Sequence, residues 1–289
     1  MAVDRQRPSL QDLARTLAQA EAVILPTHRA ESAGPLSVAK DCKLRVGVDL
    51  GTAYLVLVVL DEAGFPLAGE WQAASVARDG LVVDFIGAVD ILRGMKARVE
   101  RRIDRELTHA ATGYPPGVPL VEVKATAHVV EAAGMACSGQ IDEPSAANNI
   151  LHQREGAIVD VGGGTTGIAI LKGGKVVYSA DEATGGTHFS LVIAGALGIS
   201  LEEAEKLKVI PGEQPRLLPV VRPVMEKVAS IILRHSQGQA VKSVTMVGGG
   251  SAFLGMAEVV QSYCGIPTRV VTPPVFVTPL GLAFHDRPQ

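Results

Sequence analysis

The sequence predicts an α/β protein built from two similar halves. One observation is the segment 156–177, GAIVDVGGGTTGIAILKGGKVV, in which a strand, an aspartate, a glycine-rich turn and a second strand follow one another. Another is that residues 46–60 repeat this order, with Asp49 at the position that Asp160 has in the longer segment. The chain of 289 residues, 47% of them apolar, is also long enough for two domains with a sizeable core.

The segment 156–177 is interpreted as a phosphate-binding hairpin. Its glycines carry no side chains, so backbone N–H groups can approach an anion closely, and Thr165 and Thr166 add hydroxyls directly after them. The same glycines fit the G-x-G-x-x-G dinucleotide fingerprint, but a second strand follows them instead of the helix that this fingerprint requires. The other alternative is that the glycines only permit a tight turn. The presence of two such hairpins favours the phosphate interpretation, with one carboxylate in each half.

The composition argues against several classes of protein. A net charge of −3 and a pI near 6.2 are not typical of a nucleic-acid binder, and the basic stretch 93–105 is interleaved with acidic residues. The cysteines, Cys42, Cys137 and Cys264, are odd in number and far apart, which indicates neither a disulfide framework nor a zinc site. Because the chain shows no secretion signal and no apolar run of the ~18 residues that span a bilayer, we expect a cytoplasmic protein without a membrane segment.

The first elements are expected from capping residues and apolar spacing. Residues 9–25 form a predicted helix, because Ser9 can cap it and apolar residues recur every three or four positions up to Pro26. Residues 27–41 are predicted to be a linker or a surface strap that leads into the first domain, and we expect the whole stretch 1–41 to be an appendage that packs on the core or on a partner. The first hairpin, an edge strand and a long helix are then expected at 44–68, 71–77 and 82–106.

The predicted helix that begins near Pro144 places the acidic residue Glu143 where it could act on a ligand. Pro144 suits the first turn of a helix, so Glu143 is expected at or beside the cap, where it lies near any bound metal or attacking water. The alternative is that Glu143 is a plain N-cap. Between the long helix and this point the sequence predicts a turn at 113–117, a strand at 118–123, a helix at 126–135 and a strand at 136–141.

The second half continues with helices and one further glycine loop. Ser200 and Glu203 form a predicted capping box, and the prolines at 211–219 are expected to interrupt the helical pattern. A strand runs directly into Gly248–Ser251, again allowing a ligand close to the backbone. The expected helices are 188–197, 202–208, 220–234, 253–263 and 278–285, and the expected strands are 243–247 and 270–272.

Five stretches, in this order, resemble the actin, Hsp70 and sugar-kinase superfamily across residues 44–285. They are the first phosphate loop (48–52), a connecting segment (143–147), the second phosphate loop (160–165), an adenosine loop (247–251) and a closing helix (278–283). The resemblance implies a two-domain actin-like ATPase fold, with duplicated ribonuclease-H-like domains around a nucleotide cleft and minimal subdomains. The implied parts are an N-terminal helix and linker (1–41), domain I (42–155), domain II (156–272) and a C-terminal segment (273–289) whose helix returns to domain I.

The resemblance also implies roles for individual residues around ATP or ADP and Mg²⁺. Asp49 and Asp160 would hold the metal through its waters, and Glu143 would orient or deprotonate the attacking water. Glu205 and Lys208 resemble residues of a helix that packs over the base, although a solvated helix face is an alternative for Lys208. The residues expected around the phosphates are Gly51, Thr52, Gly162, Gly163, Gly164, Thr165 and Thr166, and those around the adenosine are Gly248, Gly249, Gly250 and Ser251.

Two departures from the Hsp70 pattern bear on turnover. Gly167 stands where Hsp70 has a second acid, and Lys96 is only a candidate for the phosphate-contacting lysine. We therefore expect hydrolysis to be slow or absent. The chain is also expected to lack a separate peptide-binding domain.

Within the superfamily the chain looks most like the EutJ family of ethanolamine-utilisation proteins, described as chaperone-like. The short chain, the start of the first long helix at Asp79–Gly80 and the second half carry this likeness. It implies a protein client such as ethanolamine ammonia-lyase or the proteins of a bacterial microcompartment, and a monomer or weak oligomer. The alternatives are a filament-forming bacterial actin relative, a nucleotide-binding scaffold without turnover and a small-molecule kinase.

Overall fold

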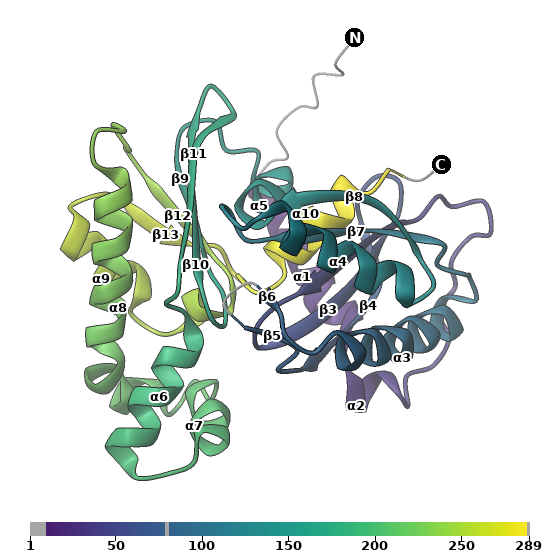
Figure 1. The fold of residues 1–289 in the computed structure, drawn as a ribbon, viewed down its shortest axis with the longest axis horizontal. Coiled ribbons are helices and arrows are strands. Elements are labelled where there is room, and N and C mark those ends of the chain that lie inside the picture. Colours follow the sequence, from purple (N-terminus) through teal and green to yellow (C-terminus); the bar gives the residue numbers. More distant parts are fainter. Residues whose placement is uncertain (1–9, 79–80, 288–289) are drawn as a thin grey trace.

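A computed structural model describes residues 10–78 and 81–287 (Figure 1). The expected cap Ser9 and the expected helix start at Asp79–Gly80 lie outside the described residues. Two β-sheets with helices packed on their faces form the two halves of the molecule, and helix α10 (Val277–His285) lies between them (Figure 1). The fold is the mixed α/β, two-sheet arrangement that the sequence predicts.

The two sheets repeat one strand order, which confirms the predicted duplication. In each half the third, second and first strands are antiparallel neighbours, and the fourth and fifth strands extend the sheet in parallel. The first sheet orders them β4 (Pro66–Ala73), β3 (Tyr54–Leu60), β2 (Arg45–Leu50), β7 (His109–Tyr114) and β8 (Ala136–Asp142). The second orders them β11 (Lys175–Glu182), β10 (Thr166–Lys172), β9 (Gly156–Val161), β12 (Val244–Val247) and β13 (Thr268–Val270).

Three clusters of buried apolar side chains form the core. One packs the first sheet against α3 (Phe85–Ile103) and α4 (Leu120–Ala132), and another packs the second sheet against α6 (Gly186–Leu197), α8 (Gln214–Ser236) and α9 (Met256–Cys264). The third joins α1 (Leu10–Val23), α5 (Glu143–Leu151) and α10 to the inner strands of both sheets. The remaining elements are α2 (Thr27–Ala30), a small pair of strands, β5 (Ala77–Arg78) and β6 (Leu81–Val82), α7 (Leu201–Lys208) and the 3₁₀ turn η1 (Gly249–Ala252). None of the helices in the described parts of the chain is long and apolar enough to cross a membrane.

The N-terminal part differs from its prediction. Helix α1 ends at Val23, and Ile24–Pro26 form a strand, β1, that pairs in parallel with β4 at the edge of the first sheet. The third strand of this sheet is therefore 66–73 rather than 71–77, and it is not an edge strand. The apolar spacing of 9–25 could not reveal this, because a strand of three residues exists only through its partner strand.

The segment 109–123 was also predicted wrongly. Residues 109–114 form β7 between β2 and β8, and 120–132 form α4, so the strand expected at 118–123 does not exist. Val121 and Val123 are β-branched and favour a strand locally, but packing of α4 on β7 and β8 overrides that preference.

Prolines do not interrupt α8 where the sequence predicts. The helix starts at Gln214 and runs through Pro219 and Pro223. With Pro215 these prolines recur every four residues on the exposed side, so the N–H groups missing at Pro219 and Pro223 are those that would bond to the carbonyls of the previous prolines. The opposite face carries buried apolar residues, and this packing offsets the lost hydrogen bonds.

Candidate functional site

The turn 51–53, which contains Gly51, and the glycine-rich turn 162–165 meet tip to tip between the sheets. In each half the turn joins the first two strands of the sheet, β2 to β3 and β9 to β10. A Cβ atom added to Gly163 would lie 2.7 Å from the Cβ of Ala53, and one added to Gly164 would lie 2.8 Å from Oγ1 of Thr52. This close approach requires glycine at both positions, and it brings the two predicted phosphate loops together.

Three carboxyl groups converge beside these turns. Asp49 near the end of β2, Asp160 in β9 and Glu143 at the first position of α5 all line a cavity of about 520 Å³. Desolvation and the charge of Asp160 raise the pKa of Asp49 to about 7. Desolvation and the charges of Asp49 and Asp160 raise the pKa of Glu143 well above its ordinary value. The three carboxyl groups therefore hold protons more tightly than exposed carboxyl groups do, and a cation would compete with those protons.

This clustering predicts that the protein loses stability as the pH rises toward neutrality. The pKa of Asp49 is higher in the folded chain than in the unfolded chain, so its contribution is complete below about pH 4 and is lost as the pH rises through about 7. We expect the melting temperature to fall between roughly pH 4 and 7 and then to level off, and to fall less in Asp49→Asn, which cannot ionise. Parallel curves for the wild type and Asp49→Asn in calorimetry would contradict the prediction; Asp104→Asn, an exposed site, is the matched control.

Asp160 is held in place from both sides. The hydroxyl of Thr278 in α10 donates a hydrogen bond to Oδ2, and a Cβ added to Gly248 would lie 2.1 Å from Oδ1. Gly248 has φ 82°, in the region that favours glycine. Burial raises the pKa of Asp160, and the Thr278 hydrogen bond opposes this rise. The helix that closes the fold and the third glycine loop thus position the same carboxylate.

Helix α5 is capped by Asp142 rather than by Glu143. The Asp142 side chain accepts a hydrogen bond of 3.0 Å from the N–H of Ser145. Glu143 is therefore not a plain N-cap, and its carboxylate is directed into the cavity at the positive end of the helix.

Lys208 and Glu205 line the cavity from α7, whose predicted capping box is present. Lys208 Nζ donates to the carbonyl of Gly186 at 2.9 Å and to Oε2 of Glu205 at 2.7 Å, and its side chain is only 12% exposed. Burial lowers the pKa of Lys208, and Glu205 opposes this effect. The alternative of a solvated helix face is therefore wrong for Lys208.

The cavity brings together most of the predicted site residues. Thr166 and Ser251 do not line it, because their hydroxyls donate to the carbonyls of Thr184 and Val247 at 2.6 Å. Lys96 pairs with Glu100 on α3 and is likewise not among the lining residues. The predicted residues that line the cavity are Asp49, Gly51, Thr52, Glu143, Asp160, Gly162, Gly163, Gly164, Thr165, Glu205, Lys208, Gly248, Gly249 and Gly250.

Several lining residues were not predicted from the sequence. Tyr54 and Trp71 pack edge to face with their ring centres 5.2 Å apart, and burial and the Glu205 carboxylate raise the pKa of Tyr54. Phe276 lines the cavity from the turn before α10, and residues 24–26 line it from the N-terminal segment. Tyr54 directly follows the first glycine turn and could have been included for that reason; the others carry no local signal.

Comparison with known proteins identifies relatives of both the sequence and the fold. The family model of the cell division protein FtsA matches residues 157–281, and that of the MreB/Mbl protein matches residues 68–209. The ethanolamine utilization protein EutJ of Escherichia coli K12 is 42% identical over 266 residues, which cover 90% of this chain and 94% of that protein.

Solved structures support the same grouping. The crystal structure of EutJ from Carboxydothermus hydrogenoformans has a TM-score of 0.87 and 42% identity, covering 96% of this chain and 99% of that one. MreB5 of Spiroplasma citri, solved bound to AMPPNP, has a TM-score of 0.67 and 16% identity, covering 83% and 94% of the two chains. This second likeness shows the actin-like fold alone.

Proposed function

Because this chain belongs to the EutJ family of ethanolamine-utilisation proteins within the actin-like superfamily, we propose that it is a nucleotide-driven, chaperone-like switch. It binds ATP or ADP with Mg²⁺ in the cavity between its halves and hydrolyses ATP slowly. The observation that carries the proposal is the convergence of two glycine turns and three carboxyl groups on one cavity. The nucleotide-bound MreB5 structures give independent support for nucleotide binding by this fold.

The residues in the cavity suit phosphate and a hard cation. The glycine turns offer backbone N–H groups, and Thr52 and Thr165 offer hydroxyls for phosphate oxygens. The acids supply only oxygen donors. Desolvation and the charges of Asp49 and Asp160 raise the pKa of Glu143, and Mg²⁺ would offset the repulsion between these charges. In the described ranges no three His, Cys, Asp or Glu side chains could hold a metal directly, so Asp49 and Asp160 would hold it through water. When bound, the metal would neutralise charge on the phosphates.

Glu143 is the residue we assign to the attacking water. It would orient the water and accept its proton, because a raised pKa makes the carboxylate a stronger base. Lys208 and Glu205 would form one edge of the adenosine site, and the loop Gly248–Gly250 would form another. Because no second acid stands at Gly167 and Lys96 lies on α3, away from the cavity, we expect turnover to be slow.

The family suggests the class of client. A protein of ethanolamine utilisation, such as ethanolamine ammonia-lyase or a microcompartment protein, would bind one nucleotide state of the switch better than the other. Such differential affinity is all that is needed for the nucleotide to control the client.

Thermal melting with ATP and ADP, with and without Mg²⁺, tests nucleotide binding. At a free concentration of 100 times Kd the ligand stabilises the fold by about 2.7 kcal/mol, which corresponds to a rise in Tm of roughly 5–10 °C. Phosphate release measured in parallel distinguishes an ATPase from a switch that only binds, and ATP-dependent sedimentation would indicate a filament instead. If no nucleotide shifts the Tm, the proposal is wrong.

A further inference from the structure

The N-terminal segment forms one wall of the nucleotide cavity. We call residues 10–30, which comprise α1, β1 and α2, the strap. Its residues Glu21, Ile24, Leu25, Pro26 and Arg29 line the same cavity as the glycine turns and the acid cluster. Sequence patterns predicted a helix here, within an appendage that packs on the core or on a partner, but they did not place it at the site.

Apolar contacts hold one face of the strap. Leu17, Ala20 and Ile24 are at most 2% exposed and belong to the cluster that also contains Phe276 and α10. A Cβ added to Gly69 on β4 would lie 2.9 Å from Cγ1 of Ile24, so glycine there allows β1 to pair closely with β4. The outer face of α1 is exposed, and β1 has only three residues. Because only one face of α1 is packed and β1 is short, we expect the strap to open at a lower free energy than the whole fold.

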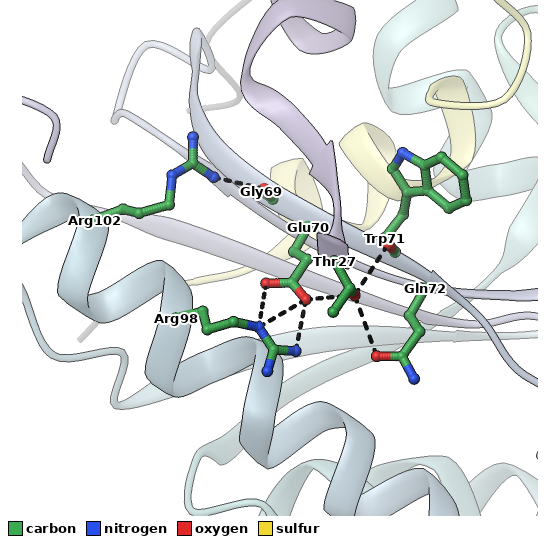
Figure 2. A network of polar contacts seen from close by, with 7 residues as sticks. All are labelled: Thr27, Gly69, Glu70, Trp71, Gln72, Arg98 and Arg102. Atoms are coloured by element: carbon green, nitrogen blue, oxygen red, sulfur yellow. Dashed lines mark hydrogen bonds and ion pairs between the residues drawn. The ribbon is translucent and has the colours of Figure 1, made fainter. Parts of the chain in front are cut away.

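Hydrogen bonds to the buried carboxylate of Glu70 hold the other face of the strap (Figure 2). Glu70 on β4 is fully buried, and Arg98 of α3 donates to its carboxylate from Nη2 at 2.7 Å and from Nε at 3.0 Å. Thr27 of the strap donates its hydroxyl to the same carboxylate at 2.7 Å. Arg102 donates to the carbonyl of Gly69 at 3.0 Å and to that of Val23 at 3.4 Å. We call Thr27, Glu70 and Arg98 the clasp.

We propose that the strap gates nucleotide exchange: it closes one side of the cavity, and its separation from β4 limits the release of bound nucleotide. The inference rests on the proposed function, because it concerns the same cavity. The clasp makes the strap a two-position element, since opening leaves the buried Glu70 without one of its hydrogen-bond donors. A partner that binds the open strap would accelerate exchange without touching the nucleotide.

Trp71 supplies a built-in probe of the strap. It is the single tryptophan of the chain, it pairs with Pro26 across β1 and β4, and it lines the cavity. Quenching of its fluorescence by acrylamide therefore reports whether the strap covers this side of the cavity. This readout does not require that any nucleotide binds.

The test compares Thr27→Val with Thr27→Ser in the full chain. Valine keeps the shape of threonine but cannot donate to Glu70, whereas serine keeps the hydroxyl. We expect Thr27→Val to increase acrylamide quenching and to accelerate release of N-methylanthraniloyl-ADP on the order of tenfold, the effect of one lost hydrogen bond to a buried charge. Thr27→Ser should match the wild type. Leu17→Ala, which loosens the apolar face of the strap, should accelerate release in the same direction.

A distant variant separates gating from general destabilisation. Val260→Ala creates a cavity in the core of the second half, far from the strap, and should lower the Tm without changing release. Greater quenching in Thr27→Val and Leu17→Ala with unchanged release would overturn the gate while the proposed function stands. Failure of the wild type to bind the fluorescent ADP would overturn both, and the quenching data would still show whether the strap opens.

Discussion

Replacing Asp160 by asparagine is expected to abolish the Mg²⁺-dependent stabilisation of the protein by ATP and ADP. Asparagine keeps the size of aspartate and can still accept the hydrogen bond from Thr278. It cannot supply the negative charge that, in the function proposed above, would hold a hydrated cation between the two turns. We therefore expect the wild-type rise in Tm of roughly 5–10 °C at 100 times Kd to fall to the value seen without Mg²⁺.

The melting temperature of Asp160→Asn without ligand provides a second test. Desolvation and the charges of Asp49 and Asp160 raise the pKa of Glu143. Removing the charge of Asp160 relieves the part of this effect that is due to repulsion, so Asp160→Asn without ligand should melt no lower than the wild type. Asp104→Asn is the matched control, because Asp104 is exposed at the C-cap of α3 and its φ of 51° suits asparagine. An undiminished Mg²⁺-dependent shift in Asp160→Asn would show that the metal, if bound, is held elsewhere.

The parts of the fold that the sequence predicted correctly are those whose signals are local. At Asp49 and Asp160, the strand, the aspartate and the glycine follow one another directly along the chain. The capping box of Ser200 and Glu203 likewise lies within four consecutive residues. Most of the residues predicted for the candidate site also follow short patterns along the chain, and the structure places most of them around one cavity.

The missed parts depend on tertiary partners. Strand β1 exists only beside β4, and α4 forms over residues whose branched side chains favour a strand in isolation. Trp71 and Phe276 enter the cavity because of how β4 and the turn before α10 pack, which no short pattern records. The hydroxyls of Thr166 and Ser251, expected at the ligand, are bonded to nearby carbonyls for the same reason.

Among the substitutions described here, Gly281→Ala is expected to lower the free energy of unfolding most. Gly281 lies where α10 crosses α5, and a Cβ there would lie 1.9 Å from the carbonyl oxygen of Ala146 and 2.4 Å from its carbon. Both atoms belong to the backbone, so relief requires the helices to separate rather than a side chain to rotate. The cost exceeds that of ordinary overpacking, and we expect about 3 kcal/mol or more, a large share of the stability of a typical domain.

The same displacement would reach the site, because α5 begins with Glu143 and α10 carries Thr278, the hydrogen-bond donor to Asp160. Denaturant unfolding of Gly281→Ala beside Gly195→Ala isolates the steric effect. Gly195 lies inside α6, is exposed and has open space at its Cβ, so alanine there should stabilise the fold by about 0.5–1 kcal/mol. If Gly281→Ala unfolded at the wild-type midpoint, the tight crossing of α5 and α10 could not be what fixes the positions of Glu143 and Asp160 at the cavity.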